Sequence, residues 1–260
     1  MVDVSRAEKS PQVPYRSKEV EPMLSNTDKS PESWSDYHVR SCTTQLRALH
    51  DALLTRILPS FNSVQQEGCE REERELARLE RTWDEHEFLD YDPLKAAEMA
   101  LEVKYNYFEL MSNLQQSLIN STAVCMNHLF EQQLLQFLQR EFGSKITEIS
   151  NGFRGVCETE MKKAGIDVAT LPGWADADIL RLVANTVKHS NGPSATELRG
   201  KRPDFFQATP STDQPVGMRL QYPAFGDFFV KVENIELWKN SLISFWTKIS
   251  ERCRERSREL

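Results

Sequence analysis

Residues 173–206 read GWADADILRLVANTVKHSNGPSATELRGKRPDFF, and this stretch decides the kind of fold that the sequence predicts. Between positions 176 and 189, apolar residues recur at the three- and four-residue spacing of a helix with one buried face, namely Ile179, Leu180, Val183 and Val187. The sequence Ser-Asn-Gly-Pro at 190–193 then ends the helix, because Asn or Gly takes a left-handed cap and Pro cannot continue a helix. The stretch therefore predicts an amphipathic helix over about 175–190, with His189 in its last turn.

The polar residues of this predicted helix form a slanting stripe. Arg181, Asn185 and His189 follow one another at four-residue intervals, so each lies one turn further along nearly the same face. A stripe of this kind suits either a chemical site or polar contacts with a neighbouring helix.

The segment Asn185-Thr186-Val187-Lys188-His189 resembles the motif of the HEPN superfamily of small helical proteins. The hallmark of that family is an Arg, four to six residues, and then a His near a helix end, often with Asn directly after the Arg. In this chain, counting back from His189 over four intervening residues leads to Ala184, and the nearest arginine, Arg181, is separated from His189 by seven residues. Upstream, residues 119–139 are similar to the helix that carries an acidic residue in such proteins, and Glu131 takes that position.

The resemblance implies an all-α, HEPN-like helical bundle and a metal-independent endoribonuclease of a bacterial toxin or antiphage (abortive-infection) system. RNA cleavage without a metal needs a general base and a fixed cation to stabilise charge on the phosphorane. Carried over, His189 is the base, Asn185 its polar partner and Arg181 the cation, in a site shared across a homodimer of motif helices. Further phosphate contacts are expected from Lys188, Arg199, Lys201 and Arg202. An RNA substrate and an antitoxin or defence-complex partner follow from the same resemblance.

A non-catalytic role fits the same residues. Lys188 and His189 in the last turn offset the negative end of the helix dipole, and Asn185 suits a hydrogen bond to a neighbouring helix. The alternative is therefore a helical interaction or scaffold protein that uses the same dimer face to hold a partner or nucleic acid.

Composition limits the other possibilities. The chain has 260 residues and a formal net charge of −7, which argues against a general affinity for nucleic acid but allows a local basic patch. Five scattered cysteines form no CxxC pair, so we expect neither a disulfide framework nor a metal site, and no motif calls for a cofactor. The sequence has no apolar run of spanning length and no signal-peptide pattern, from which we predict a cytoplasmic protein without a membrane segment.

The chain divides into a tail and one helical domain. Residues 1–31 contain four prolines among polar residues and are predicted to be disordered. Residues 32–260 are predicted to form the HEPN-like domain, with an N-terminal helical pair over 32–92 and core helices over 93–192. In the pair, Pro59 ends or kinks the first helix. In the core, Asp92 caps a long helix that Gly143 closes, and a kink or break is expected near Asn120.

The C-terminal quarter combines a loop, a hairpin and a helix. Residues 193–233 are predicted to be an irregular loop that contains a short β-hairpin at 218–232, because residues 218–222 and 228–232 alternate apolar and polar side chains. A last helix is predicted over 234–258, with Leu242, Phe245 and Ile249 facing inward.

Overall fold

A computed structural model describes residues 34–84, 92–143, 153–206 and 228–259. Within these ranges every regular element is a helix and no strand is found, so the prediction of an all-α fold is confirmed there. The described residues belong to one compact unit, Ser33–Leu260. The predicted disordered tail, residues 1–31, lies outside them. No helix in the described ranges is both long and apolar enough to cross a membrane.

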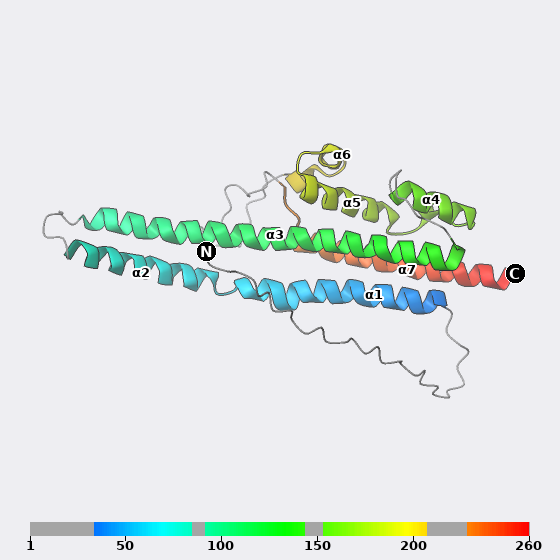
Figure 1. The fold of residues 1–260 in the computed structure, drawn as a ribbon, viewed down its shortest axis with the longest axis horizontal. Coiled ribbons are helices and arrows are strands. Elements are labelled where there is room, and N and C mark those ends of the chain that lie inside the picture. Colours follow the sequence, from blue (N-terminus) through cyan, green and yellow to red (C-terminus); the bar gives the residue numbers. More distant parts are fainter. Residues whose placement is uncertain (1–33, 85–91, 144–152, 207–227, 260) are drawn as a thin grey trace, which may run out of the picture. The chain divides into compact units, whose positions relative to one another are not determined.

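The longest element is α3, Pro93–Phe142, which has 50 residues (Figure 1). Its ends match the prediction: the Asp92 carboxylate accepts hydrogen bonds from the backbone N–H groups of Leu94 and Lys95, at 3.0 and 3.3 Å, and Gly143 caps the far end with φ 62°.

Of the kink or break predicted near Asn120, the break is wrong, because α3 is continuous there. The side chain of Asn120 is buried, and its Oδ1 accepts hydrogen bonds from Gln116 Nε2 at 2.9 Å and from the backbone N–H of Val230 at 3.2 Å. An Asn whose side chain is used in tertiary contacts no longer competes for the helix backbone.

The chain before α3 forms the predicted helical pair. Helix α1, Trp34–Ala52, continues into a π-helical turn η1, Leu53–Ile57, and a 3₁₀ turn η2, Leu58–Phe61, which contains Pro59. Helix α2, Val64–Asp84, then packs along the N-terminal half of α3 (Figure 1). The two helices approach closely at Gly68, where an added Cβ would lie 2.1 Å from a ring carbon of Phe108.

The core lies where the C-terminal half of α3 packs against α1, α5 and α7, Val232–Glu259. Phe130 and Phe137 of α3 contact Trp246 of α7 edge-on, with ring centroids 6.0 and 5.7 Å apart. Gln133 is buried among these rings, and its Oε1 accepts a hydrogen bond from Trp246 Nε1 at 3.1 Å. The last helix was predicted over 234–258 and is confirmed to within two residues.

The segment that carries the motif is a series of short helices: α4, Phe153–Lys163; η3, Val168–Thr170; α5, Trp174–His189; α6, Pro193–Lys201; and η4, Pro203–Phe206. The motif helix α5 agrees with its predicted span of 175–190. The prediction that an irregular loop follows it is wrong for 193–206. Helix α6 forms there because Pro193 takes the first helical position and Ala195 and Leu198 are buried.

The predicted β-hairpin at 218–232 is not confirmed. Residues 218–227 lie outside the described part of the chain. Residues 228–231 are not a strand, and Val232 already begins α7. The backbone N–H of Phe229 donates to the carbonyl of Phe205 at 2.8 Å, which ties this segment to η4.

Candidate functional site

Helix α5 places the predicted catalytic residues at different depths. Arg181 and Asn185 are half-buried, whereas Lys188 and His189 are exposed at the end of the helix. Helices α3, α6 and α7 pack around α5 and bury most of its remaining side chains. Because little of its surface is free, α5 alone offers a second copy only a narrow contact.

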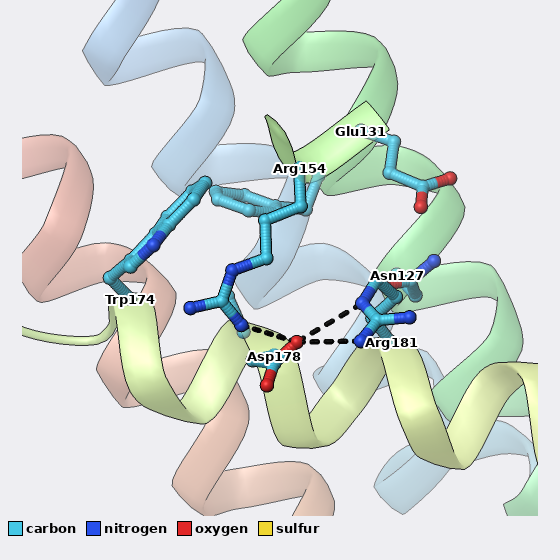
Figure 2. Close-up of a pocket in the computed structure, with 8 residues that line it drawn as sticks. Asn127, Glu131, Arg154, Trp174, Asp178 and Arg181 are labelled. Atoms are coloured by element: carbon cyan, nitrogen blue, oxygen red, sulfur yellow. Dashed lines mark hydrogen bonds and ion pairs between the residues drawn. The ribbon is translucent and has the colours of Figure 1, made fainter. Parts of the chain in front are cut away.

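Asp178, one turn before Arg181, is the centre of a charge cluster. Its carboxylate is buried and accepts hydrogen bonds from Arg181 Nε and Nη2 at 3.1 and 2.8 Å and from Lys201 Nζ at 3.0 Å. Arg154 of α4 forms a further ion pair with the same carboxylate. Figure 2 shows Arg154 and Arg181 converging on Asp178 from two sides. A single carboxylate thus joins α4, α5 and α6.

The electrostatics of the cluster favour the ionised acid. Burial alone would raise the pKa of Asp178, but hydrogen bonds from Arg154, Arg181 and Lys201 outweigh it and hold that pKa well below its ordinary value. The pKa of Lys201 is raised by its hydrogen bonds to Glu197 and Asp178. Arg154 is also paired with Glu158, at 2.9 Å between Nε and Oε1, so the three carboxylates Asp178, Glu158 and Glu197 balance the three cations. Arg181 and Lys201 are therefore neutralised within the chain.

A small pocket lies beside the cluster, with Phe130, Trp174 and Ala177 as its apolar wall. Asp178, Arg154 and Arg181 border it, together with Asn127 and Glu131 of α3. Glu131, which takes the acidic position in the resemblance to HEPN proteins, forms no hydrogen bond or ion pair with any described residue (Figure 2). The pocket therefore brings Glu131 near Arg181 without a direct contact between them.

Arg181 does not approach His189. The side chain of Arg181 leans toward the N-terminus of α5 to reach Asp178, as helical side chains generally do. His189 lies eight residues later, about 12 Å along the helix axis. Within one chain, the predicted base and the predicted cation therefore do not face a common phosphate.

Exposed basic side chains lie instead where α5 meets α6. This α5–α6 corner consists of Lys188, His189 and Arg199. Arg199 Nη2 donates to Asn191 Oδ1 at 3.3 Å, and its guanidinium lies 4.4 Å from the ring centroid of Phe206. None of the three corner residues forms an ion pair with a described acid.

The other two predicted phosphate ligands differ from the corner. Lys201 is paired with Asp178 and also with Glu197, its Nζ lying 2.7 Å from Glu197 Oε1. Arg202 Nη2 lies 2.7 Å from Asp204 Oδ2. The structure thus separates the predicted RNA-binding set into paired cations, Lys201 and Arg202, and cations without an acidic partner among the described residues, Lys188 and Arg199. The predicted catalytic cation, Arg181, is also paired.

Sequence reasoning missed Arg154 and Asp178. The spacing of Asp178 and Arg181, three residues apart on one helix, was a visible signal for an ion pair. Arg154 gave none, because it lies 24 positions before Asp178 and meets it only through the fold. Within the described ranges, no group of three or more His, Cys, Asp or Glu side chains is placed to hold a metal ion.

No protein-family model, no curated protein and no solved structure matches this chain. The described residues thus form an all-α fold with a buried charge cluster around Asp178 and, at the end of α5, the exposed α5–α6 corner.

Proposed function

We propose that this chain is an HEPN-like RNA-binding protein that holds RNA at the α5–α6 corner without cleaving it. The observation that carries the proposal is the division of the cations. Lys188 and Arg199 are exposed and have no acidic partner among the described residues, whereas Arg181 is neutralised by Asp178. Phosphate binding needs exposed cations without an acidic partner, and within the described ranges Lys188 and Arg199 meet this condition. Cleavage at His189 would need Arg181 free of Asp178, so that its charge could stabilise the phosphorane.

The corner offers two fixed contact types. Lys188 and Arg199 supply positive charge to phosphates, while the Arg199 guanidinium over Phe206 forms a flat surface suited to stacking on a base. The imidazole ring of His189, which follows Lys188 directly in the sequence, is also exposed at this corner. The formal net charge of −7 argues against a general affinity for a polyanion, so binding depends on a local basic patch such as this corner.

Binding of a fluorescent single-stranded RNA, followed by anisotropy over a range of salt concentrations, tests the proposal. We expect the double variant Lys188→Ala/Arg199→Ala to bind on the order of tenfold more weakly, and its salt slope to fall by about 1.4, since each lost phosphate contact removes about 0.7. Arg202→Ala is the matched control, because that guanidinium is already paired with Asp204. Equal binding by wild type and double variant would exclude the corner as the RNA site.

A second candidate function is a metal-independent endoribonuclease of a toxin or antiphage system, with an antitoxin or defence-complex partner. It is favoured by the exposure of His189, which forms no hydrogen bond or ion pair with any described residue. In this case Arg181 can act as the predicted cation only after it leaves Asp178, or a second copy must supply its own.

Cleavage of total RNA in the presence of EDTA distinguishes the two functions. The RNA-binding proposal expects no cleavage by the wild type. If the protein is a nuclease, the wild type should cleave RNA, and the cleavage rate should fall by a factor on the order of 10²–10⁴ in His189→Ala, because the general base is lost. If His189→Ala and Arg181→Ala are each inactive and their mixture regains activity, the site is shared between two copies.

A further inference from the structure

The N-terminal half of α3 exposes an apolar stripe that nothing in the described structure covers. This α3 stripe consists of Met99, Val103, Leu110 and Leu114, whose exposed fractions are 39, 37, 63 and 46%. At 100° per residue the four side chains fall within about 60° of one another on the helix. On the same face further along α3 the exposed residues are polar, namely Ser121, His128 and Gln132. The change in character along one face marks the stripe as a contact surface.

An acidic row borders the α3 stripe on one side. Glu98, Glu102 and Glu109 lie about 100° round α3 from the stripe and are exposed. None of them forms an ion pair with a described residue.

A basic row borders the stripe on the other side. Arg71, Arg74 and Arg78 share one face of α2, at spacings of three and four residues. The guanidinium of Arg71 lies 4.1 Å from the ring centroid of Tyr107, which occurs between Val103 and Leu110 in α3. Arg78 is paired with Glu75, whereas Arg71 and Arg74 have no salt-bridge partner among the described residues.

The order acidic row, apolar stripe, basic row is complementary to itself in one orientation only. Two copies that meet face to face are related by a two-fold axis lying in the interface. An axis along α3 makes the two α3 helices parallel and sets each acidic row against the basic row of the other copy. An axis across α3 makes them antiparallel and sets like charges against each other, which is unfavourable.

We propose that a second copy of this chain docks on the α3 stripe, with the two α3 helices parallel. Leu110 then contacts Leu110 of the second copy. On each side of the apolar interface, the acidic row of one copy lies against the basic row of the other. This surface is separate from the α5–α6 corner, so the proposal does not depend on RNA binding.

Sedimentation velocity over a range of protein concentrations tests whether the copies associate. We expect a dimer whose dissociation constant rises on the order of tenfold or more in Leu110→Glu, because each copy then presents a charge to an apolar seam. Leu237→Glu on α7 is the control, since Leu237 is also exposed, at 45%, but lies on another helix. A monomeric wild type, or a dimer that Leu110→Glu leaves unchanged, would overturn the proposal.

Reversing the charges of the acidic and basic rows tests whether these rows pair across the proposed interface. Glu102→Lys/Glu109→Lys is expected to weaken the dimer, and the further changes Arg71→Glu/Arg74→Glu in the same chain are expected to restore it, because the two rows have then exchanged signs. Failure of the second pair to restore association would contradict the parallel arrangement.

Cysteine cross-linking reads the orientation directly, in a Cys125→Ser background that removes the exposed thiol of α3. Leu110→Cys should cross-link to itself on mild oxidation in the parallel arrangement. In an antiparallel one centred on the stripe, the two positions lie about 10 Å apart along the axis, too far for a disulfide.

Two outcomes of the cross-linking would overturn the proposal. Cross-linking only in a mixture of Val103→Cys and Leu110→Cys would show the antiparallel orientation. A monomeric Leu110→Cys variant whose introduced thiol resists a thiol reagent would show that the chain covers its own stripe.

Discussion

The ion pair with Asp178 gives Arg181 a structural role. A free arginine would suit phosphate binding, but here the guanidinium donates two hydrogen bonds to a buried carboxylate. Such a pair resists rearrangement, because separating it leaves an unpaired charge in the protein interior. The same two residues therefore stabilise the packing of α4, α5 and α6 and remove Arg181 from the predicted site.

Asp178→Asn is expected to lower the free energy of unfolding by about 1–3 kcal/mol at pH 7, because three cations lose their common acceptor. Since the pKa of Asp178 in the folded protein lies below the unfolded value of about 3.9, its stabilisation is complete above about pH 5 and is lost as the pH falls through the folded pKa. The difference between wild type and variant should therefore narrow below about pH 4.

Urea unfolding of both proteins at a series of pH values measures this difference. Asp204→Asn serves as the control, since the Asp204 side chain is 56% exposed and its pair with Arg202 is worth about 1 kcal/mol or less. If the difference in the free energy of unfolding between wild type and Asp178→Asn stays constant down to pH 2, folding does not lower the pKa of Asp178, and the prediction is wrong.

Gly173 fixes the start of α5. Its φ of 82° lies in the left-handed region, and an added Cβ would lie 2.1 Å from the backbone carbonyl oxygen of Ser241 in α7. Gly173→Ala is expected to destabilise the protein by about 2–4 kcal/mol, through backbone strain and the forced separation of α5 from α7. The midpoint of urea unfolding measures the loss.

Gly155→Ala on α4 is the matched control for Gly173→Ala. A Cβ at Gly155 meets nothing within 4 Å, and the residue lies inside a helix, so this change should stabilise by about 0.5–1 kcal/mol. A Gly173→Ala variant as stable as Gly155→Ala would contradict the close approach of α5 to α7.

At the scale of elements, the ends of α5 and α6 place the residues of the α5–α6 corner. Helix α5 ends at His189, and Ser190 takes a positive φ of 54° before α6 begins at Pro193. This short connection turns the chain so that Arg199 reaches Asn191, two residues beyond His189. The α5–α6 corner thus depends on α6, which the sequence pattern presented as a loop.

Helix α3 serves two purposes along its length. Its C-terminal half carries Phe130, Gln133 and Phe137 into the core. Its N-terminal half contacts α2 alone among the long helices and leaves the α3 stripe uncovered in the described structure. A continuous helix is what places both surfaces on one rigid element, and a break at Asn120 would have separated them.

At the scale of the whole chain, the two proposed surfaces use different helices. We propose that RNA binds at the ends of α5 and α6, and that a second copy docks on the α2–α3 pair. Variants at one surface should therefore leave binding at the other unaffected.

The sequence by itself determined the helices. Periodicity and caps are local signals, and they predicted α5, the ends of α3 and the extent of α7 because a helix depends on residues within four or five positions of one another. They failed at Asn120 and at Pro193–Lys201, where the outcome depended on partners that are distant in the sequence, Val230 in the first case and the buried surroundings of Leu198 in the second.

Only the tertiary structure decided what the polar residues do. The sequence contained Arg181, Asn185 and His189 at suggestive spacing, but an ion pair depends on three-dimensional distance, and Arg154 and Lys201 approach Asp178 from two other helices. The same holds for the α3 stripe, whose side chains are apolar enough for a core and are left exposed because α2 packs on a different face. Burial and pairing are properties of the packed chain, so they were settled by the arrangement of the helices and not by their individual sequences.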